Sequence, residues 1–261
     1  MIELNFTKMQ ALGNDFCVFG SPADKKQPDA EFIRALCNRH YGVGCDCAVF
    51  IGHSETADYF MHVYNPNGFE AEICGNALRC SAKYVCDNGY FTKRLLNVQT
   101  KSGVSKVSVV SDSIITEIGT AKIIESDFLN IAGIGIPFVS VSLGNPHCVI
   151  FVKNLSDEEF AFLGKSIENN PRFENGTNVE FAFISSPDSI EMRVWERGIG
   201  ETMSCSTGSC ACVAAANHLG KDFNKCDVIQ QGGTITVTVN ENGSMTAIGD
   251  CKTVFRGSLT K

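Results

Sequence analysis

The sequence predicts an α+β protein of two pseudo-symmetric halves, each a mostly antiparallel β-sheet or barrel wrapped around one central helix. Three observations lead to this fold class. The chain has 261 residues, enough for two ordinary domains. Segments of the two halves resemble each other at one constant offset, which indicates a duplication. Short runs of β-forming residues surround one helical segment in each half, as is typical of α+β architectures.

The duplication is clearest in two heptapeptides. Residues 12–18 read LGNDFCV and residues 143–149 read LGNPHCV, with five of seven positions identical and an offset of 131. Chance similarity between short motifs is the alternative explanation. Other pairs at the same offset are Tyr64 and Trp195, Asn65 and Glu196, Glu70 and Glu201, Cys74 and Cys205, and Gly89 and Gly220.

Each half is expected to hold a helix that starts at a cysteine and ends at a glycine. The first runs from Cys74 to Gly89 and the second from Cys205 to Gly220, because glycine commonly terminates helices. The second is so rich in Ala, Ser and Cys that it has little polar face, which predicts burial on all sides. Period-two and apolar runs predict strands at Phe16–Phe19, Ala48–Ile51, Tyr59–Tyr64, Val104–Val110, Ile114–Ile118, Val139–Val141, His147–Val152, Glu180–Ile184, Ile190–Trp195, Thr234–Val239 and Met245–Ile248.

The halves are expected to be closely packed domains without a Pro/Ser-rich linker. We predict that residues 1–118 form the first and residues 119–250 the second, with a strand at 251–261 joining the first. The join is expected near Ser111–Lys122.

Composition excludes several classes of protein. Apolar residues make up 44% and charged residues 20%, which argues against disorder. The formal charge of −7 argues against a nucleic-acid binder. No apolar stretch is long enough to span a membrane. Met1–Gln10 has neither a basic start nor an apolar run, so we expect no signal peptide and a cytoplasmic location.

Thirteen cysteines are the unusual feature of the composition. A reduced protein can use Cys as a small buried apolar residue, and we assign eleven of the thirteen to packing. A disulfide framework is not expected at this length. Cys45-x-Cys47, Cys74-x5-Cys80 and Cys210-x-Cys212 lack the spacing of zinc knuckles, so we expect no metal.

Cys74 and Cys205 differ because each begins a predicted helix. The positive end of the helix dipole favours a thiolate, which predicts a thiol pKa lowered from about 8.5 toward neutrality. If the halves face each other about a pseudo-twofold axis, the two sulfurs face each other across a cleft. Matched thiols on opposite faces of one carbon could remove and deliver a proton. Helix-start N–H groups could hold the substrate carboxylate, which predicts a racemase or epimerase.

Seven ordered motifs over essentially the whole chain resemble the diaminopimelate epimerase family. This family interconverts LL- and meso-diaminopimelate, on the way to lysine and peptidoglycan, without a cofactor. The motifs are Leu12-Gly13-Asn14-Asp15-Phe16, Gly42-Val43-Gly44-x-Asp46, Asn65-x-x-Gly68-x-Glu70, Cys74-Gly75-Asn76-x-x-Arg79-Cys80, Gly144-Asn145-Pro146-His147, Glu196-Arg197-Gly198-x-Gly200-Glu201-Thr202 and Cys205-x-Thr207-Gly208-x-Cys210-Ala211.

The resemblance implies a role for each matching residue. Cys74 and Cys205 correspond to the acid/base pair, and His147 and Glu196 to the residues that assist it. The reacting α-carboxylate is bound at Gly75, Asn76, Ser206 and Thr207. The substrate, mainly its distal amino-acid group, is surrounded by Asn14, Cys47, Asn65, Asn145, Asn178, Glu196 and Arg197. The resemblance also implies no cofactor, a small amino-acid substrate and a homodimer.

Four departures from the family put the substrate in doubt. Cys47 stands where the family has Gln, Ala77 and Ser206 stand where it has Gly, and Phe69 adds apolar bulk. They leave open a racemase of another amino acid, such as histidine or a broad set. A non-catalytic, cysteine-rich binding or metal-storing protein is the alternative from another class. The candidate Asn residues could be simple turn formers, His147 a structural loop residue, and Glu196 with Arg197 an exposed ion pair.

Overall fold

The computed structural model describes residues 3–24, 27–110 and 113–260. It divides into two compact units: unit 1 comprises residues 1–117 and 248–261, and unit 2 comprises residues 118–247. The chain passes from unit 1 to unit 2 within strand β7 (Ser113–Thr120) and returns within β16 (Ser244–Asp250). Of the predicted join, Ser111 and Asp112 lie outside the described residues.

Unit 1 is a mostly antiparallel sheet with one long and one short helix. Its strands pair in the order β17-β1-β2-β3-β4-β5-β6-β7, and only the β2–β3 and β4–β5 pairs of this series are parallel. The elements are β1 (Glu3–Ala11), β2 (Asn14–Gly20), α1 (Ala30–Cys37), β3 (Cys47–Gly52), β4 (Tyr59–Tyr64), α2 (Gly75–Asp87), β5 (Leu95–Thr100), β6 (Gly103–Val110) and β17 (Lys252–Thr260).

Unit 2 repeats this arrangement. Its strands pair in the order β8-β9-β10-β11-β12-β14-β15, again with two parallel pairs, β10–β11 and β12–β14. The elements are β8 (Lys122–Ile131), β9 (Ile134–Ser142), β10 (Pro146–Phe151), α3 (Asp157–Glu168), β11 (Asn178–Ser186), β12 (Ser189–Glu196), β13 (Gly200–Thr202), α4 (Ser206–His218), β14 (Lys225–Gln230) and β15 (Gly233–Val239).

The strand register shows that the two units correspond residue by residue. In unit 1, Phe16 of β2 pairs with Cys47 of β3. In unit 2, His147 of β10 pairs with Asn178 of β11, and both residues lie 131 positions further along the chain. The short helices α1 and α3 sit at the same place in the two orders, between the strands of the first parallel pair. A residue of one unit therefore has a definite counterpart in the other.

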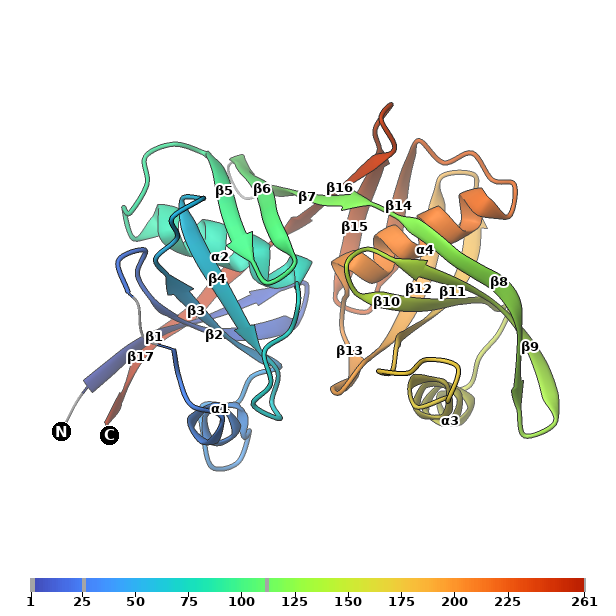
Figure 1. Ribbon diagram of the computed structural model, residues 1–261, viewed down its shortest axis with the longest axis horizontal. Helices are drawn as coiled ribbons and strands as arrows, with labels where there is room; N and C mark the ends of the chain where they lie inside the picture. Colours follow the sequence, from blue (N-terminus) through green and yellow to red (C-terminus); the bar gives the residue numbers. More distant parts are fainter. Residues whose placement is uncertain (1–2, 25–26, 111–112, 261) are drawn as a thin grey trace. The chain divides into compact units, whose positions relative to one another are not determined.

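A long helix occupies the centre of each unit (Figure 1). Helix α2 packs against β1, β2, β3, β4 and β6, and helix α4 packs against β8 to β12 and β15. Most residues of both helices are buried, including the run from Ser206 to Val213 in α4. Small side chains let the strands approach the helix from several sides. The predicted fold class and the burial of the second helix on all sides are confirmed.

Several elements were absent from the sequence prediction. They include α1 and α3, which each bury only three residues along one face. Helix α3 begins at a capping box, in which Ser156 and Glu159 exchange side-chain-to-backbone hydrogen bonds, a pattern that marks helix starts. The remaining unpredicted strands are β1, β5, β8, β13 and β14, whose polar residues blur the apolar alternation.

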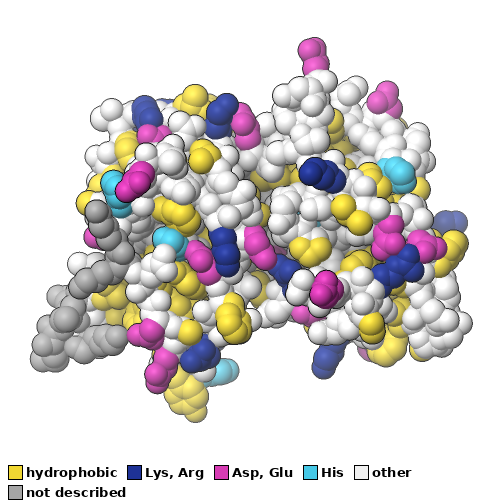
Figure 2. All heavy atoms as spheres, in the orientation of Figure 1, with side chains coloured by type: hydrophobic (Ala, Val, Ile, Leu, Met, Phe, Trp, Pro, Cys, Tyr) yellow, Lys and Arg dark blue, Asp and Glu magenta, His cyan; other side chains and the backbone are white. Residues whose placement is uncertain are grey.

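Surface charge, helix hydrophobicity and the cysteines can be compared with the expectations about nucleic-acid binding, membrane insertion, metal binding and disulfides. Figure 2 shows acidic and basic side chains interspersed on the face it draws. Within the described residues, no helix is long and apolar enough to cross a membrane. Over the same part of the chain, no group of three His, Cys, Asp or Glu side chains could hold a metal ion. All thirteen cysteines are free thiols.

Candidate active site

Cys74 is the N-cap residue of helix α2. Its backbone is extended, and its Sγ accepts the N–H of Ala77 at 3.4 Å. An N-cap normally satisfies a helix-start N–H with a side-chain oxygen, and here a sulfur does so. Cys74 is half-buried, whereas Gly75, Asn76 and Ala77 of the first turn are buried. The sulfur therefore lies at the positive end of the helix dipole.

A hydrogen-bonded chain of side chains fixes the first turn of α2. Buried Asn76 donates from Nδ2 to Asn14 Oδ1 at 3.1 Å and accepts from Arg79 Nη2 at 2.7 Å. Asn14 in turn donates to Asp46 Oδ2 at 2.9 Å. Arg79 is fully buried. Two residues predicted to bind substrate, Asn14 and Asn76, thus contact each other directly.

The far end of this chain is a cluster of charges. Arg39 Nη2 lies 2.7 Å from both Asp15 Oδ1 and Asp46 Oδ1, and Lys8 Nζ lies 2.5 Å from Asp15 Oδ2. Burial opposes ionisation of Asp15, but hydrogen bonds from Arg39 and Lys8 lower its pKa. Burial, followed by the nearby Asp15 charge, raises the pKa of Asp46. The cluster anchors the carboxylate that holds Asn14.

Cys47 and Asn65 form a second contact in unit 1. The buried Cys47 thiol donates to Asn65 Oδ1, with Sγ and Oδ1 3.6 Å apart. The thiol thus supplies a polar partner at the position where the family carries Gln. Phe69 is 73% exposed and contacts this region through its backbone, since Asn65 donates its N–H to Phe69 O at 2.9 Å.

Cys205 is the N-cap of helix α4 and is more deeply buried than Cys74. Its Sγ accepts the N–H of Gly208 at 3.4 Å and lies 3.5 Å from Thr207 Oγ1. Burial, and then the charges of Glu196 and Glu180, raise the pKa of the Cys205 thiol well above its ordinary value. The prediction of a lowered pKa is therefore wrong for Cys205. The hydrogen bonds from Thr207 and Gly208 oppose the rise but are outweighed.

Among the described residues, His147 forms no hydrogen bond with the Cys205 sulfur. Its Nε2 lies 3.1 Å from Asn145 Oδ1, and Asn145 Nδ2 donates to Thr207 Oγ1 at 3.3 Å. Its Nδ1 lies 2.6 Å from Glu180 Oε1. Predicted residues Asn145, His147 and Thr207 are thus joined in one chain that ends at Cys205.

The remaining predicted residues of unit 2 lie around the end of β12. Asn178 donates to Pro146 O at 2.8 Å and accepts the N–H of Arg197 at 3.0 Å, so it fixes two loops. Glu196 Oε1 accepts from Thr202 Oγ1 at 2.5 Å. Arg197 Nη1 donates to Asn175 O at 3.4 Å. Ser206 is buried in the first turn of α4.

Sequence reasoning missed three residues. Glu180 was expected only as the start of a strand. Gln230 accepts the Cys205 N–H at 2.7 Å and donates to Ser209 Oγ at 3.1 Å, fixing the backbone at the cysteine. Cys45 was assigned to packing, yet hydrogen bonding with the thiols of Cys17 and Cys37 lowers its pKa. The Cys37 and Cys45 sulfurs lie 3.6 Å apart. The signal that could have revealed Glu180 is a charged residue whose counterpart, 131 positions earlier in the sequence, is apolar.

The diaminopimelate epimerase family model matches residues 6–124 and 139–254. The diaminopimelate epimerase of Parabacteroides distasonis is 38% identical over 264 residues, which cover 98% of each chain. That of Desulfitobacterium hafniense is 36% identical over 279 residues, with the same coverage. The chain belongs to the diaminopimelate epimerase family. The family prediction and the prediction of an isomerase are confirmed.

Solved structures extend the fold beyond this family. A hydroxyproline epimerase of Agrobacterium vitis superposes with a TM-score of 0.79 at 14% identity, covering 98% of this chain and 92% of that one. A phenazine biosynthesis protein of the PhzF family from Bacillus anthracis gives a TM-score of 0.78 at 19% identity, covering both chains completely. At these identities the likeness concerns the fold alone.

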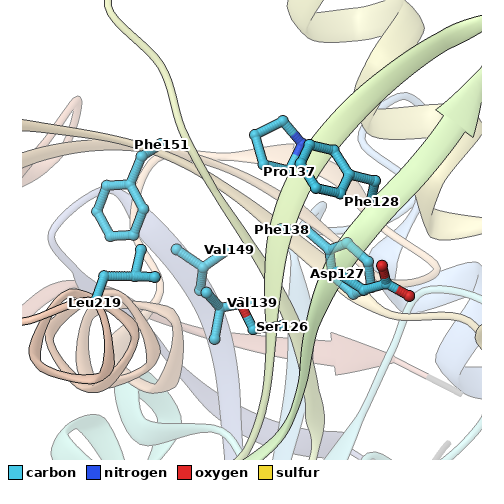
Figure 3. A pocket seen from close by; sticks show the side chains of 9 residues that line it. All are labelled: Ser126, Asp127, Phe128, Pro137, Phe138, Val139, Val149, Phe151 and Leu219. Carbon is cyan, nitrogen blue, oxygen red and sulfur yellow. The ribbon is translucent and has the colours of Figure 1, made fainter.

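The apolar cavity in Figure 3 lies away from the Cys205 sulfur. It has a volume of about 240 Å³, and its wall includes Phe128, Phe151 and Leu219. Leu219 is the C-cap of α4, at the opposite end of the 13-residue helix from Cys205. At 1.5 Å per residue, the two ends are about 20 Å apart. The cavity contains none of the predicted site residues.

Proposed function

We propose that this protein is a cofactor-independent epimerase that inverts one α-carbon of diaminopimelate, interconverting the LL and meso forms. One observation carries the proposal. Two cysteines occupy the same N-cap position in two helices related by the duplication, and each sulfur accepts an N–H from its own first turn. The names of the relatives support diaminopimelate as the substrate.

The reaction needs one thiolate and one thiol. A thiolate removes the α-proton of the bound amino acid, and the C–H electron pair remains on the α-carbon, delocalised toward the carboxylate. The other thiol delivers its proton to the opposite face, which inverts the centre and leaves the second sulfur as thiolate. The mechanism requires both sulfurs to reach the same α-carbon from opposite sides. Burial keeps the proton on Cys205, which suits Cys205 to the donor role at the start of a turnover.

We assign the α-carboxylate to the helix starts. The N–H groups of Gly75 and Asn76 in unit 1, and of Ser206 and Thr207 in unit 2, belong to the first turns of α2 and α4, at the positive end of each helix dipole. Such groups bind anions and stabilise charge that develops in the transition state.

We assign the distal amino-acid group to the polar residues around these turns. Arg197 can hold its carboxylate through a guanidinium fork, and Glu196 can balance its ammonium. Asn65 and Asn178 donate and accept hydrogen bonds without adding charge. Cys47 supports this set by holding Asn65.

A racemase of another amino acid is the second candidate. Its support is Cys47 itself, because a thiol is shorter than the Gln side chain of the family and reaches Asn65 rather than further into a site. Histidine and a broad set of single amino acids are the substrates that this reading predicts.

Deuterium uptake at the α-carbon in D2O distinguishes these functions. The substrates are LL-diaminopimelate and a panel of single amino acids that includes histidine. Uptake on diaminopimelate alone is the expected result. Uptake on histidine or others, without diaminopimelate, would establish the racemase. No uptake on any amino acid would favour a non-catalytic binding protein.

Three further proposals accompany the function. We propose that no pyridoxal phosphate takes part, which an absorbance spectrum of the active enzyme checks directly. We propose a homodimer, which light scattering on the eluting protein tests. We propose a cytoplasmic location, since the thiols are free and thiols stay reduced there. Fractionation of cells that make the protein tests the location.

A further inference from the structure

The Cys205 half-site contains a buried carboxylate that the proposed mechanism does not use. Glu180 and His147 lie on neighbouring strands β11 and β10, both fully buried, with Glu180 Oε1 2.6 Å from His147 Nδ1. Their counterparts in unit 1, by the offset of 131, are Val49 and Phe16. The same backbone is thus compatible with an apolar pair. Burying ionisable groups costs free energy that an apolar pair avoids, so the polar pair in unit 2 calls for a functional reason.

Hydrogen-bond directions place the protons of this pair. Asn145 Nδ2 donates to Thr207, which leaves Asn145 Oδ1 to face His147 Nε2 at 3.1 Å. A carbonyl oxygen only accepts, so Nε2 carries a hydrogen. A further proton then lies between Nδ1 and Glu180, either on the ring beside a carboxylate or on the carboxyl beside a neutral ring. In both cases Glu180 keeps Nε2 as the donor.

The chain of contacts continues to the cysteine. The Thr207 hydroxyl accepts from Asn145 Nδ2, which leaves its own hydrogen free to donate to Cys205 Sγ, 3.5 Å away. Four contacts therefore link the Glu180 carboxyl to the Cys205 sulfur through His147, Asn145 and Thr207. If the His147 ring turned, Asn145 would lose its partner and Thr207 its fixed orientation.

Glu180 also packs directly beneath the first turn of α4. A Cβ added at Gly208 would lie only 2.7 Å from Glu180 Oε1, so this turn has room for the carboxylate only because residue 208 is glycine. The counterpart of Gly208 in unit 1 is Ala77, and that of Glu180 is Val49. Glu180 Oε2 has no hydrogen-bond partner among the described residues. A buried oxygen without a partner destabilises the fold, so its retention favours a role at the site.

We propose that Glu180 is a positioning residue of the Cys205 half-site. It fixes the ring of His147 and the hydrogen on Nε2, and it thereby fixes, through Asn145 and Thr207, the hydrogen bond to the Cys205 sulfur. The proposal rests on the proposed function insofar as Cys205 is one of the two acid/base thiols.

Three variants test the proposal by epimerase kinetics. Glu180→Val removes the partner of Nδ1 and should lower kcat/KM about 100-fold, within the range for a mispositioned acid or base. Glu180→Gln can donate an amide N–H to Nδ1 and leave the hydrogen on Nε2, so kcat/KM should return to within about tenfold of wild type. Val49→Ala, at the matched position of unit 1, is the control. It should lower the melting temperature while kcat/KM stays within about threefold.

The double variant His147→Phe/Glu180→Val copies the pair found in unit 1 and guards against a variant that fails to fold. It should fold at least as stably as wild type and lose as much activity as Glu180→Val. Full activity in the double variant or in Glu180→Val would overturn the proposal. Glu180→Gln as inactive as Glu180→Val would also overturn it, because the Nε2 donor would then not be what Glu180 supplies.

A substrate-independent measurement separates this proposal from the proposed function. In ¹⁵N-histidine spectra, His147 should show a slowly exchanging Nε2–H in the wild type and in Glu180→Gln but not in Glu180→Val. If the wild type showed this Nε2–H signal but no activity on diaminopimelate, the proposed substrate would be wrong. The proposed role of Glu180 would be unaffected. An unprotonated Nε2 in the wild type would refute the role of Glu180 whatever the substrate.

Discussion

The two half-sites share a backbone and differ in the charge buried next to it. In unit 1, a guanidinium, Arg79, holds the Asn at the start of α2. In unit 2, a carboxyl, Glu180, lies under the start of α4 and holds His147. The duplication thus places each sulfur identically within its own unit, while the side chains around it have diverged. This difference suits a reaction in which one cysteine carries a proton whenever the other lacks it.

The largest effect should come from the sulfurs themselves. Cys74→Ala and Cys205→Ala should each lower the epimerisation rate about 10³-fold or more, because each removes one of the two proton-transfer groups. Deuterium uptake and chiral chromatography of the product measure the loss. Cys80→Ala and Cys210→Ala, within the same helices, are matched controls that should keep activity within about threefold. Full activity without either candidate sulfur would contradict the two-base mechanism.

Substitution of Arg79 tests the other side of the comparison. Arg79→Met removes the hydrogen bond to Asn76 Oδ1. Asn76 is then less firmly held, which should weaken its hydrogen bond to Asn14. Losing a buried partner is worth about 1–3 kcal/mol, which corresponds to a fall in kcat/KM of roughly 5- to 150-fold. The melting temperature should change little, because the substitution also removes a buried charge, whose burial costs free energy. Unchanged kinetics in Arg79→Met, together with a lower melting temperature, would make Arg79 purely structural.

Alkaline pH should destabilise both units of the protein. Burial raises the pKa of Cys148, Cys205 and Cys212 in unit 2, and of Cys80 in unit 1, well above the ordinary value of 9.0. Above about pH 9 the unfolded thiols lose protons that the folded thiols keep, so the free energy of unfolding falls by up to about 1.4 kcal/mol per pH unit per thiol.

Urea unfolding at pH 7.5 and pH 10 measures this dependence, and hydrogen exchange locates it. The stability should fall as the pH rises above about 9, where the thiols of the unfolded chain ionise. Cys148→Ala should flatten the slope above pH 9. A stability that rises with pH in this range is the outcome that the burial of these thiols does not allow.

The smallest effect should come from Cys47. Cys47→Ala removes one hydrogen bond to Asn65, a loss of about 0.5–1.5 kcal/mol, which should raise KM roughly 2- to 13-fold and leave kcat nearly unchanged. Cys47→Gln, which restores the family residue, should have a KM equal to or lower than that of the wild type. A change in kcat with constant KM would place Cys47 in the chemistry rather than in binding.

Much of the fold could be predicted because the duplication is visible in the sequence. The offset of 131 that relates Cys74 to Cys205 also governs strand register, in which Ala48 pairs with Tyr64 and Val179 with Trp195. Strands with clear apolar alternation were found. Strand β14 was missed because its buried positions include Cys226 and Gln230, which do not stand out as strand formers.

The sequence predicts candidate residues for the site but not their electrostatics. Position at a helix start predicts an acidic thiol, and burial of Cys205 reverses that effect. Burial depends on packing between distant strands, which a local motif does not encode. Glu180 illustrates the same limit. Inside an apolar strand it resembles a boundary residue, and only its pairing with His147 shows what it does.

The path of the chain through the two units has a consequence for how the protein is made. Unit 2 is one continuous segment, residues 118–247, whereas unit 1 needs residues from both ends, because β17 pairs with β1 along nearly its whole length. On the ribosome, unit 2 is therefore complete while unit 1 still lacks an edge strand. Joining segments so far apart in sequence is a slow, late step. Until then β1 exposes unpaired backbone and the side of Phe6 that later packs against Phe255. Because unit 1 is completed last during synthesis, the Cys74 unit is the more prone to aggregation.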